Sequence, residues 1–438
     1  MRAIRAHFKY GFGLVIIVIS LFMAGCASQN TPQMVKRSTQ TPPHGLEPST
    51  WQSIPLPRLD LELLAYVVSP VDPATIYACT SNGSSQAQNR IALWRTQDTG
   101  QHWSSLHLPA SPGTGCQLSL IPTQPPRLAV LVTNPYGNLR PCDNDSLYLS
   151  DDGGNSLQHV PYSSIAPEGA QTVFCQVMMS SHYLYLYYSF DDRGNALQMS
   201  LLERTGDMGV TWTRIDTTFG ANALFLPPQV GAKDSLAVIV RHLPLAVKDE
   251  PVLWTSLDGG ASWKRVGTLP DQIGTFLLAP PSANTSWLTA TTPFYALAEE
   301  QIPSNLYRLR VFESGNGQQW SPTPPLPVPG ASTTQPGLLQ ALAVFADGRL
   351  FAFGVNPKNG LSGSASTQRK TSAFWLWMWN PHSSRWQVLP TPLNYLADES
   401  CGLCWNAQAS SSSNQANNLY VYQPDTHGSF FRVLLPSS

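Results

Sequence analysis

The chain has 438 residues and a formal net charge of −1, from 26 Lys and Arg against 27 Asp and Glu. Such a balance excludes the basic field that nucleic-acid binding requires. Only 12% of the residues are charged, and 31 glycines and 38 prolines favour short strands and turns over helices. We therefore expect an all-β protein whose whole length can serve one ring of small sheets, with no nucleic acid as a partner.

The first 25 residues have the order of an export signal. A positive start, Arg2, Arg5 and Lys9, precedes an apolar run from Gly11 to Ala24. The run is shorter than the roughly 20 residues that a membrane-spanning helix needs, which is typical of a signal peptide. An uncleaved anchor helix and an ordinary secretory peptide are the alternatives for this segment.

The apolar run ends in Met23-Ala24-Gly25-Cys26, which resembles the bacterial lipobox. In lipobox proteins, small residues precede a cysteine that is diacylated and becomes the mature N-terminus. Met23 stands where leucine is usual. The resemblance implies a lipid anchor at Cys26, which would hold the protein to a membrane of the cell envelope on the extracytoplasmic side.

A polar segment follows over residues 27–49. Its Pro, Thr, Gln and Ser residues leave almost no large apolar side chain, so the segment cannot bury enough surface to fold. We therefore expect three parts: a signal peptide at 1–25, the lipidated Cys26 with a flexible tether at 26–50, and a folded domain at 51–438.

Six cysteines remain beside Cys26, and an even number outside the cytoplasm favours disulfides. We expect them to pair in chain order: Cys79 with Cys116, Cys142 with Cys175, and Cys401 with Cys404. The Cys401-Gly-Leu-Cys404 spacing also suggests half of a zinc site or a redox motif. Neither a second such pair nor a histidine cluster accompanies it, so we expect no metal and no cofactor.

An octapeptide recurs along the chain, with a hydroxyl residue first, Asp third, Gly fifth and Trp eighth. Three full copies occur: Thr96, Asp98, Gly100 and Trp103; Thr205, Asp207, Gly209 and Trp212; and Ser256, Asp258, Gly260 and Trp263. A fourth copy keeps Ser150, Asp152 and Gly154 but ends in Leu157. A weaker copy at Glu313–Trp320 lacks both the hydroxyl and the Asp, and an echo at Trp379–Trp386 keeps only its closing aromatic residue.

The shared positions have a local physical reason. A short Asp side chain accepts hydrogen bonds from the backbone N–H groups of its own turn, and Gly adopts a positive φ without steric cost. The Trp begins the next strand and buries a large flat surface. We therefore interpret the octapeptides as structural turns whose carboxylates are not catalytic.

These octapeptides resemble the Asp box, also called the bacterial neuraminidase repeat. The resemblance covers residues 51–438 and implies a β-propeller. The group includes sialidases, xyloglucan hydrolases, sortilin-type receptors and photosystem II assembly factors, which share a scaffold more than a function.

Strand-like runs around each octapeptide predict four antiparallel strands per repeat. In the first repeat these are Leu63–Ser69, Thr75–Thr80, Ile91–Thr96 and Trp103–Leu108. The segment after Trp51 looks like the last strand of a repeat, and the C-terminal runs Cys404–Ala407, Leu419–Gln423 and Phe430–Leu435 look like three strands that lack a fourth. We therefore expect a single propeller of seven blades, closed by N- and C-terminal strands in the last blade. Six or eight blades are the alternatives.

Sialidases of this fold resemble one another in an Arg-Ile-Pro near the start, a three-arginine clamp, a Tyr–Glu nucleophile pair and an Asp acid. This chain has Arg58-Leu-Asp and Arg90-Ile-Ala instead, and nothing marks Arg241 or Arg308 as part of a convergent set. Xyloglucan hydrolases use a cleft between two propellers, and this chain has the length of one. We therefore expect no catalytic residues and a monomeric scaffold that binds or assembles an unknown protein or glycan. An exo-sialidase-like glycoside hydrolase acting on envelope or extracellular glycans is the alternative.

Binding is expected at the rim opposite the octapeptides, where the loops between blades and those between second and third strands lie. The predicted loops are 133–146, 189–196, 242–251, 291–305, 321–338, 355–373 and 390–403. Aromatic residues in or just after them are the candidate binding residues: Tyr136, Phe294, Tyr295, Tyr395 and Trp405. In the alternative interpretation, each ring packs under its own loop.

Overall fold

The computed structural model describes the chain between Trp51 and Leu435. The described residues are 51–58, 61–69, 72–82, 90–109, 113, 115–121, 123–133, 145–162, 171–191, 198–215, 222–226, 234, 236–241, 252–269, 278–279, 294–302, 306–327, 338–344, 349–356, 371–380, 383–389, 394–396, 406–411, 417–423 and 429–435. The chain divides into two units, Met1–Gly45 and Leu46–Ser438, and all described residues belong to the second. They form strands and turns without a helix, which confirms the all-β prediction for this part of the chain. Within these ranges there is thus no helix of the length and apolarity that crossing a membrane would require.

The described strands form seven antiparallel sheets, which we number in chain order. The first three are β2 (Glu62–Val68), β3 (Ile76–Ser81), β4 (Ile91–Thr96) and β5 (Ser104–Leu106); β6 (Gly115–Ile121), β7 (Arg127–Thr133), β8 (Ser146–Ser150) and β9 (Gln158–His159); and β10 (Gln171–Met179), β11 (Leu184–Asp191), β12 (Gln198–Thr205) and β13 (Thr213–Ile215). The fourth and fifth are β14 (Asn222–Leu226), β15 (Leu236–Arg241), β16 (Val252–Ser256) and β17 (Lys264–Thr268); and β18 (Leu278–Ala279), β19 (Phe294–Ile302), β20 (Leu306–Ser314) and β21 (Ser321–Pro322). The last two are β22 (Leu338–Val344), β23 (Leu350–Asn356), β24 (Thr371–Asn380), β25 (Arg385–Leu389) and β26 (Asn394–Leu396); and β27 (Asn406–Ser411), β28 (Asn417–Gln423), β29 (Ser429–Leu435) and β1 (Trp51–Ser53).

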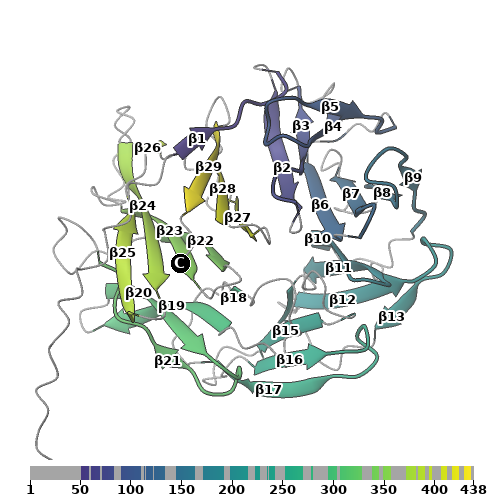
Figure 1. The fold of residues 1–438 in the computed structure, drawn as a ribbon. Helices are drawn as coiled ribbons and strands as arrows, with labels where there is room; N and C mark the ends of the chain where they lie inside the picture. Colours follow the sequence, from purple (N-terminus) through teal and green to yellow (C-terminus); the bar gives the residue numbers. More distant parts are fainter. Residues whose placement is uncertain are drawn as a thin grey trace, which may run out of the picture. The chain divides into compact units, whose positions relative to one another are not determined.

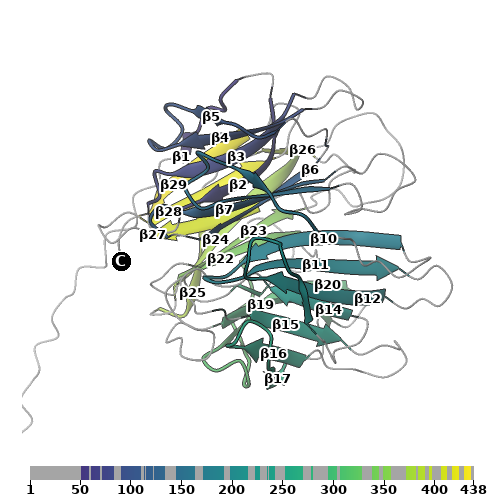
Figure 2. The ribbon, with the colours of Figure 1, turned by 90° about the vertical axis from the view of Figure 1, so that its right-hand side faces the viewer.

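This succession of small antiparallel sheets is an architecture of the propeller type. Apart from β26 in the sixth sheet and β1 in the seventh, neighbouring strands in each sheet follow one another in the chain, as β10, β11 and β12 show in Figure 2. Alternate connections therefore lie at the same end of a sheet. The octapeptides join third strands to fourth strands, and they share their end with the connections from first to second strands. We call this end the turn rim and the other end the opposite rim.

Second strands are apolar on both sides because each lies between two neighbouring sheets. In β7, Ala129 and Leu131 pack in a cluster with the third sheet, whereas Leu128, Val130 and Val132 pack in a cluster with the first sheet. All five side chains are at most 1% exposed. The core is therefore a series of layers between consecutive sheets rather than one central cluster.

The seventh sheet joins the two ends of the described chain. Strand β1 pairs with β29, with Trp51 opposite Val433, and the two strands lie side by side in Figure 1. The N–H of Ile54 extends this pairing by donating to the carbonyl of Phe430 (2.8 Å). Ile54 and Phe430 also belong to one buried cluster with residues of the first sheet. The seventh sheet therefore packs against the first.

Two sequence predictions about these sheets were wrong in detail. The first strand of the seventh sheet was expected at Cys404–Ala407 and is instead β27, Asn406–Ser411. The sixth sheet has a fifth strand, because β26 pairs with the first part of β24, opposite Thr371–Ala373. β24 has ten residues and its neighbour β25 has five, so the free half of its edge can accept a second short strand.

Candidate functional site

The first octapeptide turn, Thr96–Trp103, is held by hydrogen bonds to its own side chains. The hydroxyl of Thr96 donates to Asp98 Oδ1 (2.7 Å) and accepts from the N–H of Gly100 (2.9 Å). Asp98 Oδ1 also accepts from the N–H of His102 (2.9 Å), and His102 Nδ1 lies 2.6 Å from Oδ2. Two short side chains thus occupy the N–H groups that the turn leaves without strand partners.

Three more turns repeat this arrangement. In the turn Thr205–Trp212, the N–H of Gly209 donates to the Thr205 hydroxyl (2.9 Å), and the N–H of Thr211 donates to Asp207 Oδ1 (2.8 Å). The turns that begin at Ser150 and Ser256 have the same two bonds, to Ser150 and Asp152 and to Ser256 and Asp258. The octapeptides therefore share one geometry and not only one sequence pattern.

The fifth turn corrects our alignment of the weaker copy. We placed Glu313 in the first position and found no hydroxyl and no acid. In the structure, the Ser314 hydroxyl accepts from the N–H of Gly317 (2.8 Å), and Asn316 Oδ1 accepts from the N–H groups of Gln318 (2.9 Å) and Gln319 (3.0 Å). The turn is one residue shorter, and an amide oxygen replaces the carboxylate. Any short side chain with a carbonyl oxygen can accept these bonds.

The fifth position of the four full-length turns requires glycine for two reasons. Its φ lies between +85° and +92°, where a side chain is strained. A Cβ on Gly209 would also lie 2.3 Å from Val160 Cγ1, and one on Gly154 would lie 2.6 Å from Leu106 Cδ1. The fourth position also has positive φ but is less restrictive, because Thr99 and Met208 occupy it.

The turns also link neighbouring sheets. The indole N–H of Trp103 donates to the carbonyl of Pro55 (2.8 Å) beside the seventh sheet, and that of Trp212 donates to the carbonyl of Pro161 (2.9 Å) after the second. From the other direction, Arg204 on β12 donates to the carbonyl of Gly259 (2.6 Å) in the next turn. These three turns are therefore joints between their own sheets and the preceding ones.

Hydrogen bonding keeps the turn carboxylates ionised. Bonds from His102 hold the pKa of Asp98 at about 2, and bonds from Ser156 and Thr211 do the same for Asp152 and Asp207. Burial raises the pKa of Asp258, but hydrogen bonds from Ser262 and Ser256 outweigh it and the net shift is downward. A general acid needs a pKa near the working pH, so these four groups are unsuited to donating protons.

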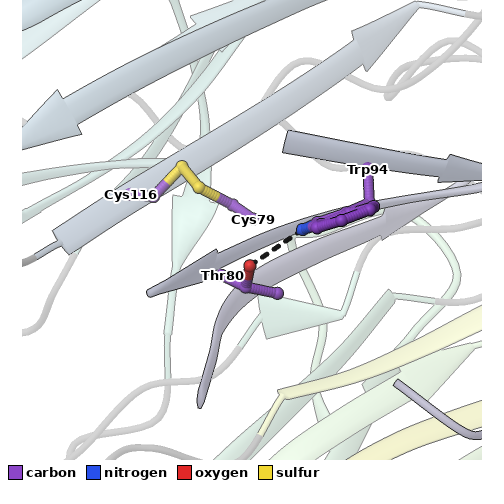
Figure 3. Close-up of a disulfide and its surroundings, with 4 residues drawn as sticks. All are labelled: Cys79, Thr80, Trp94 and Cys116. Carbon is purple, nitrogen blue, oxygen red and sulfur yellow. Dashed lines mark hydrogen bonds between the residues drawn. A yellow bond between two sulfur atoms is a disulfide. The ribbon is translucent and has the colours of Figure 1, made fainter. Parts of the chain in front are cut away.

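A disulfide joins the first and second sheets, as we predicted. Cys79 on β3 and Cys116 on β6 are bonded, with their Cα atoms 6.4 Å apart (Figure 3). Both side chains are buried, at 0% and 8% exposure. Cys175 on β10 is also disulfide-bonded. Its predicted partner Cys142 lies outside the described residues, as do Cys401, Cys404 and the lipidation candidate Cys26.

The structure corrects part of the predicted binding face. The segment 291–305 was expected to be a loop at the opposite rim, but Phe294–Ile302 is strand β19. Phe294 pairs with Ser314 at the turn rim, and Tyr295 is fully buried. A continuous run of aromatic and small apolar residues, Phe294 to Ala298, favours a strand between two neighbouring sheets over an exposed loop.

The other candidates remain compatible with the opposite rim or fall outside the description. Tyr395 lies on β26 and pairs with Ser372, near the start of the third strand of its sheet. Since that strand ends at the turn rim, Tyr395 lies toward the opposite rim. Tyr136 and Trp405 lie outside the described residues.

Sequence reasoning missed a polar group between the third and fourth sheets. Asp234 Oδ1 accepts from the Ser180 hydroxyl (2.6 Å), and Oδ2 lies 2.7 Å from His182 Nδ1. Ser181 Oγ lies 3.2 Å from the same His182 nitrogen. In a hydrolytic triad, the serine and the acid contact opposite nitrogens of the histidine ring. Here both contact Nδ1, so the group links the two sheets and does not activate a serine nucleophile. No motif links residues that lie 52 positions apart in the chain, so the sequence offered no signal.

Glu203 on β12 differs from the four turn aspartates in the direction of its pKa shift. It is 4% exposed, and burial raises the pKa of its carboxyl to about 7, although the charge of Arg214 lowers it. Arg214 lies directly opposite on β13. In the described ranges, no group of three or more His, Cys, Asp and Glu side chains could hold a metal ion.

No protein-family model and no curated protein sequence matches the chain. A puromycin-hydrolysing peptidase of Mycobacterium tuberculosis is 15% identical, over 87% of this chain and 53% of its own, with a TM-score of 0.49. The polysaccharide lyase Uly1 is 12% identical, over 91% of this chain and 94% of its own, with a TM-score of 0.46. The β-propeller domain of the Trilobed protease from Pyrococcus furiosus is 8% identical, over 85% of this chain and 93% of its own, with a TM-score of 0.45. No residue role in this chain follows from such distant likenesses.

Proposed function

We propose that this chain is an exported lipoprotein, anchored by diacylated Cys26, whose seven sheets are the blades of one closed Asp-box propeller. The propeller acts as a scaffold that binds or assembles a protein or glycan at the extracytoplasmic face of a membrane. The tether at 26–50 separates it from the lipid headgroups.

The observation that carries this proposal is the Cys79–Cys116 disulfide. Structural disulfides form and persist outside the reducing cytoplasm. This one crosses a buried layer between two sheets, so it is part of the core and not a surface thiol pair. It supports export independently of the N-terminal signal, and the lipobox-like end of that signal supports the lipid anchor.

Contacts between the seventh and first sheets support a closed ring. The hydroxyl of Tyr66 on β2 donates to the carbonyl of Tyr420 on β28 (3.1 Å), and the hydroxyl of Tyr420 donates to the carbonyl of Pro73. Tyr66 and Phe430 also pack ring against ring, with centroids 4.6 Å apart. The two hydrogen bonds join residues that lie 354 and 347 positions apart in the chain.

The state of five described acids, the four turn aspartates and Glu203, supports binding over catalysis. Asp98, Asp152, Asp207 and Asp258 serve their own turns, and Glu203 is buried. A glycosidase needs two carboxyl groups that reach the sugar from one cleft. None of these five offers its carboxyl to such a cleft, so the opposite rim with Tyr136, Tyr395 and Trp405 is the proposed contact surface.

The anchor is tested by labelling cells with a clickable fatty acid. Wild-type chain should take up the label and partition into membranes, and Cys26→Ala should lose both properties. Ser28→Ala, two residues downstream, is the control and should keep them. Undiminished labelling of Cys26→Ala would remove the lipoprotein assignment.

The scaffold role is tested on full-length protein in detergent micelles. Fluorogenic sialosides and a panel of β-glucans should show no turnover. On arrays of envelope glycans and in pull-downs, Tyr395→Ala should weaken capture, whereas Val210→Ala, a 78% exposed side chain at the turn rim, should not. Turnover that disappears on substitution of one acid would favour the hydrolase instead.

A further inference from the structure

Glu203 occupies a position that is aromatic in the other sheets with an octapeptide turn. The residue two places before the first position of the turn is Trp94, Tyr148, Trp254 or Phe312 in the first, second, fourth and fifth sheets. Trp94, Tyr148 and Trp254 each pack in the layer between their sheet and the preceding one. The third sheet therefore has a carboxyl where its neighbours have a ring.

Apart from Arg214 on β13, the surroundings of this carboxyl are apolar. Glu203 lies on the same side of β12 as Leu201 and directly opposite Leu186 on β11, and both leucines belong to the layer between the second and third sheets. The second sheet contributes Ile121, Ala129, Leu131, Leu147, Leu149 and Val160 to this layer. Among the described residues, the Glu203 carboxyl has no hydrogen-bond partner, and its charged neighbour is Arg214.

Among the described residues, few other ionisable groups face the layer. Arg127 on β7 is paired with Asp151 (2.6 Å) and donates to the carbonyl of Ser181, between β10 and β11 of the third sheet (3.2 Å). Arg214 approaches from β13. Tyr162, which follows the second sheet, donates its hydroxyl to the carbonyl of Asp145, and Tyr188 lies on β11. Cys175 on β10 is disulfide-bonded and does not titrate. Glu203 is therefore the described group of this layer whose charge changes near neutral pH.

We propose that Glu203 makes the joint between the second and third sheets sensitive to pH, so that the joint is closed in acid and opens as the carboxyl ionises. Burial disfavours the charged form, and no hydrogen bond compensates for it. The inference goes beyond the proposed scaffold role, and it holds whatever the scaffold binds.

The direction of the pH effect follows from the pKa of the Glu203 carboxyl. The carboxyl has its ordinary pKa of 4.5 when the joint is open and a pKa of about 7 when it is closed. Stability of the joint is therefore complete below pH 4.5 and is lost as the pH rises through 7. Between pH 5.5 and 8.0, these two values correspond to an increase in the opening equilibrium on the order of 30-fold.

Hydrogen exchange measured by mass spectrometry on the full-length chain tests this. After correction for intrinsic exchange, the opening equilibrium constant of amides in β10–β13 and in Gln158–Tyr162 should be on the order of 30-fold larger at pH 8.0 than at pH 5.5. Amides of β27–β29 should not change. In Glu203→Gln the pH effect should vanish, whereas Glu313→Gln, at the end of β20, should keep it.

Arg214→Ala gives a second test that does not depend on the fold of the Gln variant. Removing the nearby positive charge raises the pKa of Glu203, so the opening should move to higher pH. An unchanged pH profile in Glu203→Gln would overturn the proposal, as would a shift to lower pH in Arg214→Ala. Neither result would bear on the anchor or on ligand capture, so the scaffold proposal is tested separately.

Discussion

Gly209→Ala should be among the most destabilising single methyl additions in the octapeptide turns. The new Cβ meets Val160 Cγ1 at 2.3 Å and the carbonyl oxygen of Pro161 at 3.0 Å, and Val160 is fully buried. A β-branched side chain has little rotamer freedom with which to move away. The left-handed backbone costs about 1–2 kcal/mol, and overpacking costs about 1–3 kcal/mol. We expect a total loss of about 2–5 kcal/mol.

Two other glycines separate these contributions. Gly153 has a φ of +74°, but its Cβ would meet nothing closer than 3.5 Å, so Gly153→Ala should cost only the backbone strain of about 1–2 kcal/mol. Gly315 has an ordinary φ and no atom within 4 Å of an added Cβ, so Gly315→Ala should change stability by less than about 0.5 kcal/mol. The assay is urea unfolding of the three variants beside the wild type. Equal losses for Gly209→Ala and Gly153→Ala would refute the steric argument.

Two further predictions concern the links between sheets. Trp212→Phe removes the indole hydrogen bond to the carbonyl of Pro161 and should lower the free energy of unfolding in urea by about 1 kcal/mol. Trp320→Phe should lower it by less, because the indole N–H of Trp320 has no partner among the described residues. A larger loss for Trp320→Phe than for Trp212→Phe would contradict the linking role. The bridge Cys79–Cys116 closes a separation of 37 residues, for which the chain-entropy model gives about 4 kcal/mol. The double variant Cys79→Ala/Cys116→Ala should lose stability of this order in thermal unfolding, and an unchanged midpoint would show that the bridge does not constrain the unfolded chain.

Local chemistry explains why much of the fold was predictable. The octapeptide pattern records hydrogen bonds inside eight residues, such as those between Thr96, Asp98 and Gly100, so their spacing is visible in the sequence. Strand limits near the turns followed from it, and β4 was predicted at its observed bounds, Ile91–Thr96. The pairing of Cys79 with Cys116 was predictable because the two strands belong to consecutive repeats.

Features that depend on neighbouring sheets were not predictable in this way. Tyr295 was assigned to a binding loop because it is aromatic and lies between turn-like segments, yet packing on both sides of β19 buries it. The fifth turn was misaligned because Asn316 can replace an Asp only when the turn is shortened by one residue. In the sequence, Glu203 is one of several mid-chain glutamates in or beside predicted strands and turns; its special position appears only when the equivalent residues of the other sheets are compared with it.

The pairing of β1 with β29 also has a consequence for synthesis. Trp51 lies among the first residues of the folded unit to leave the ribosome, and its partner Val433 is among the last. The segment that carries Ile54 and Pro55 must therefore wait, with apolar side chains exposed, until β29 has emerged. Non-local pairing of this kind is slow because most of the chain must be ordered before the contact forms. Premature release or a truncated C-terminus would leave the N-terminal strand without its partner, and such an edge is prone to pair with another chain.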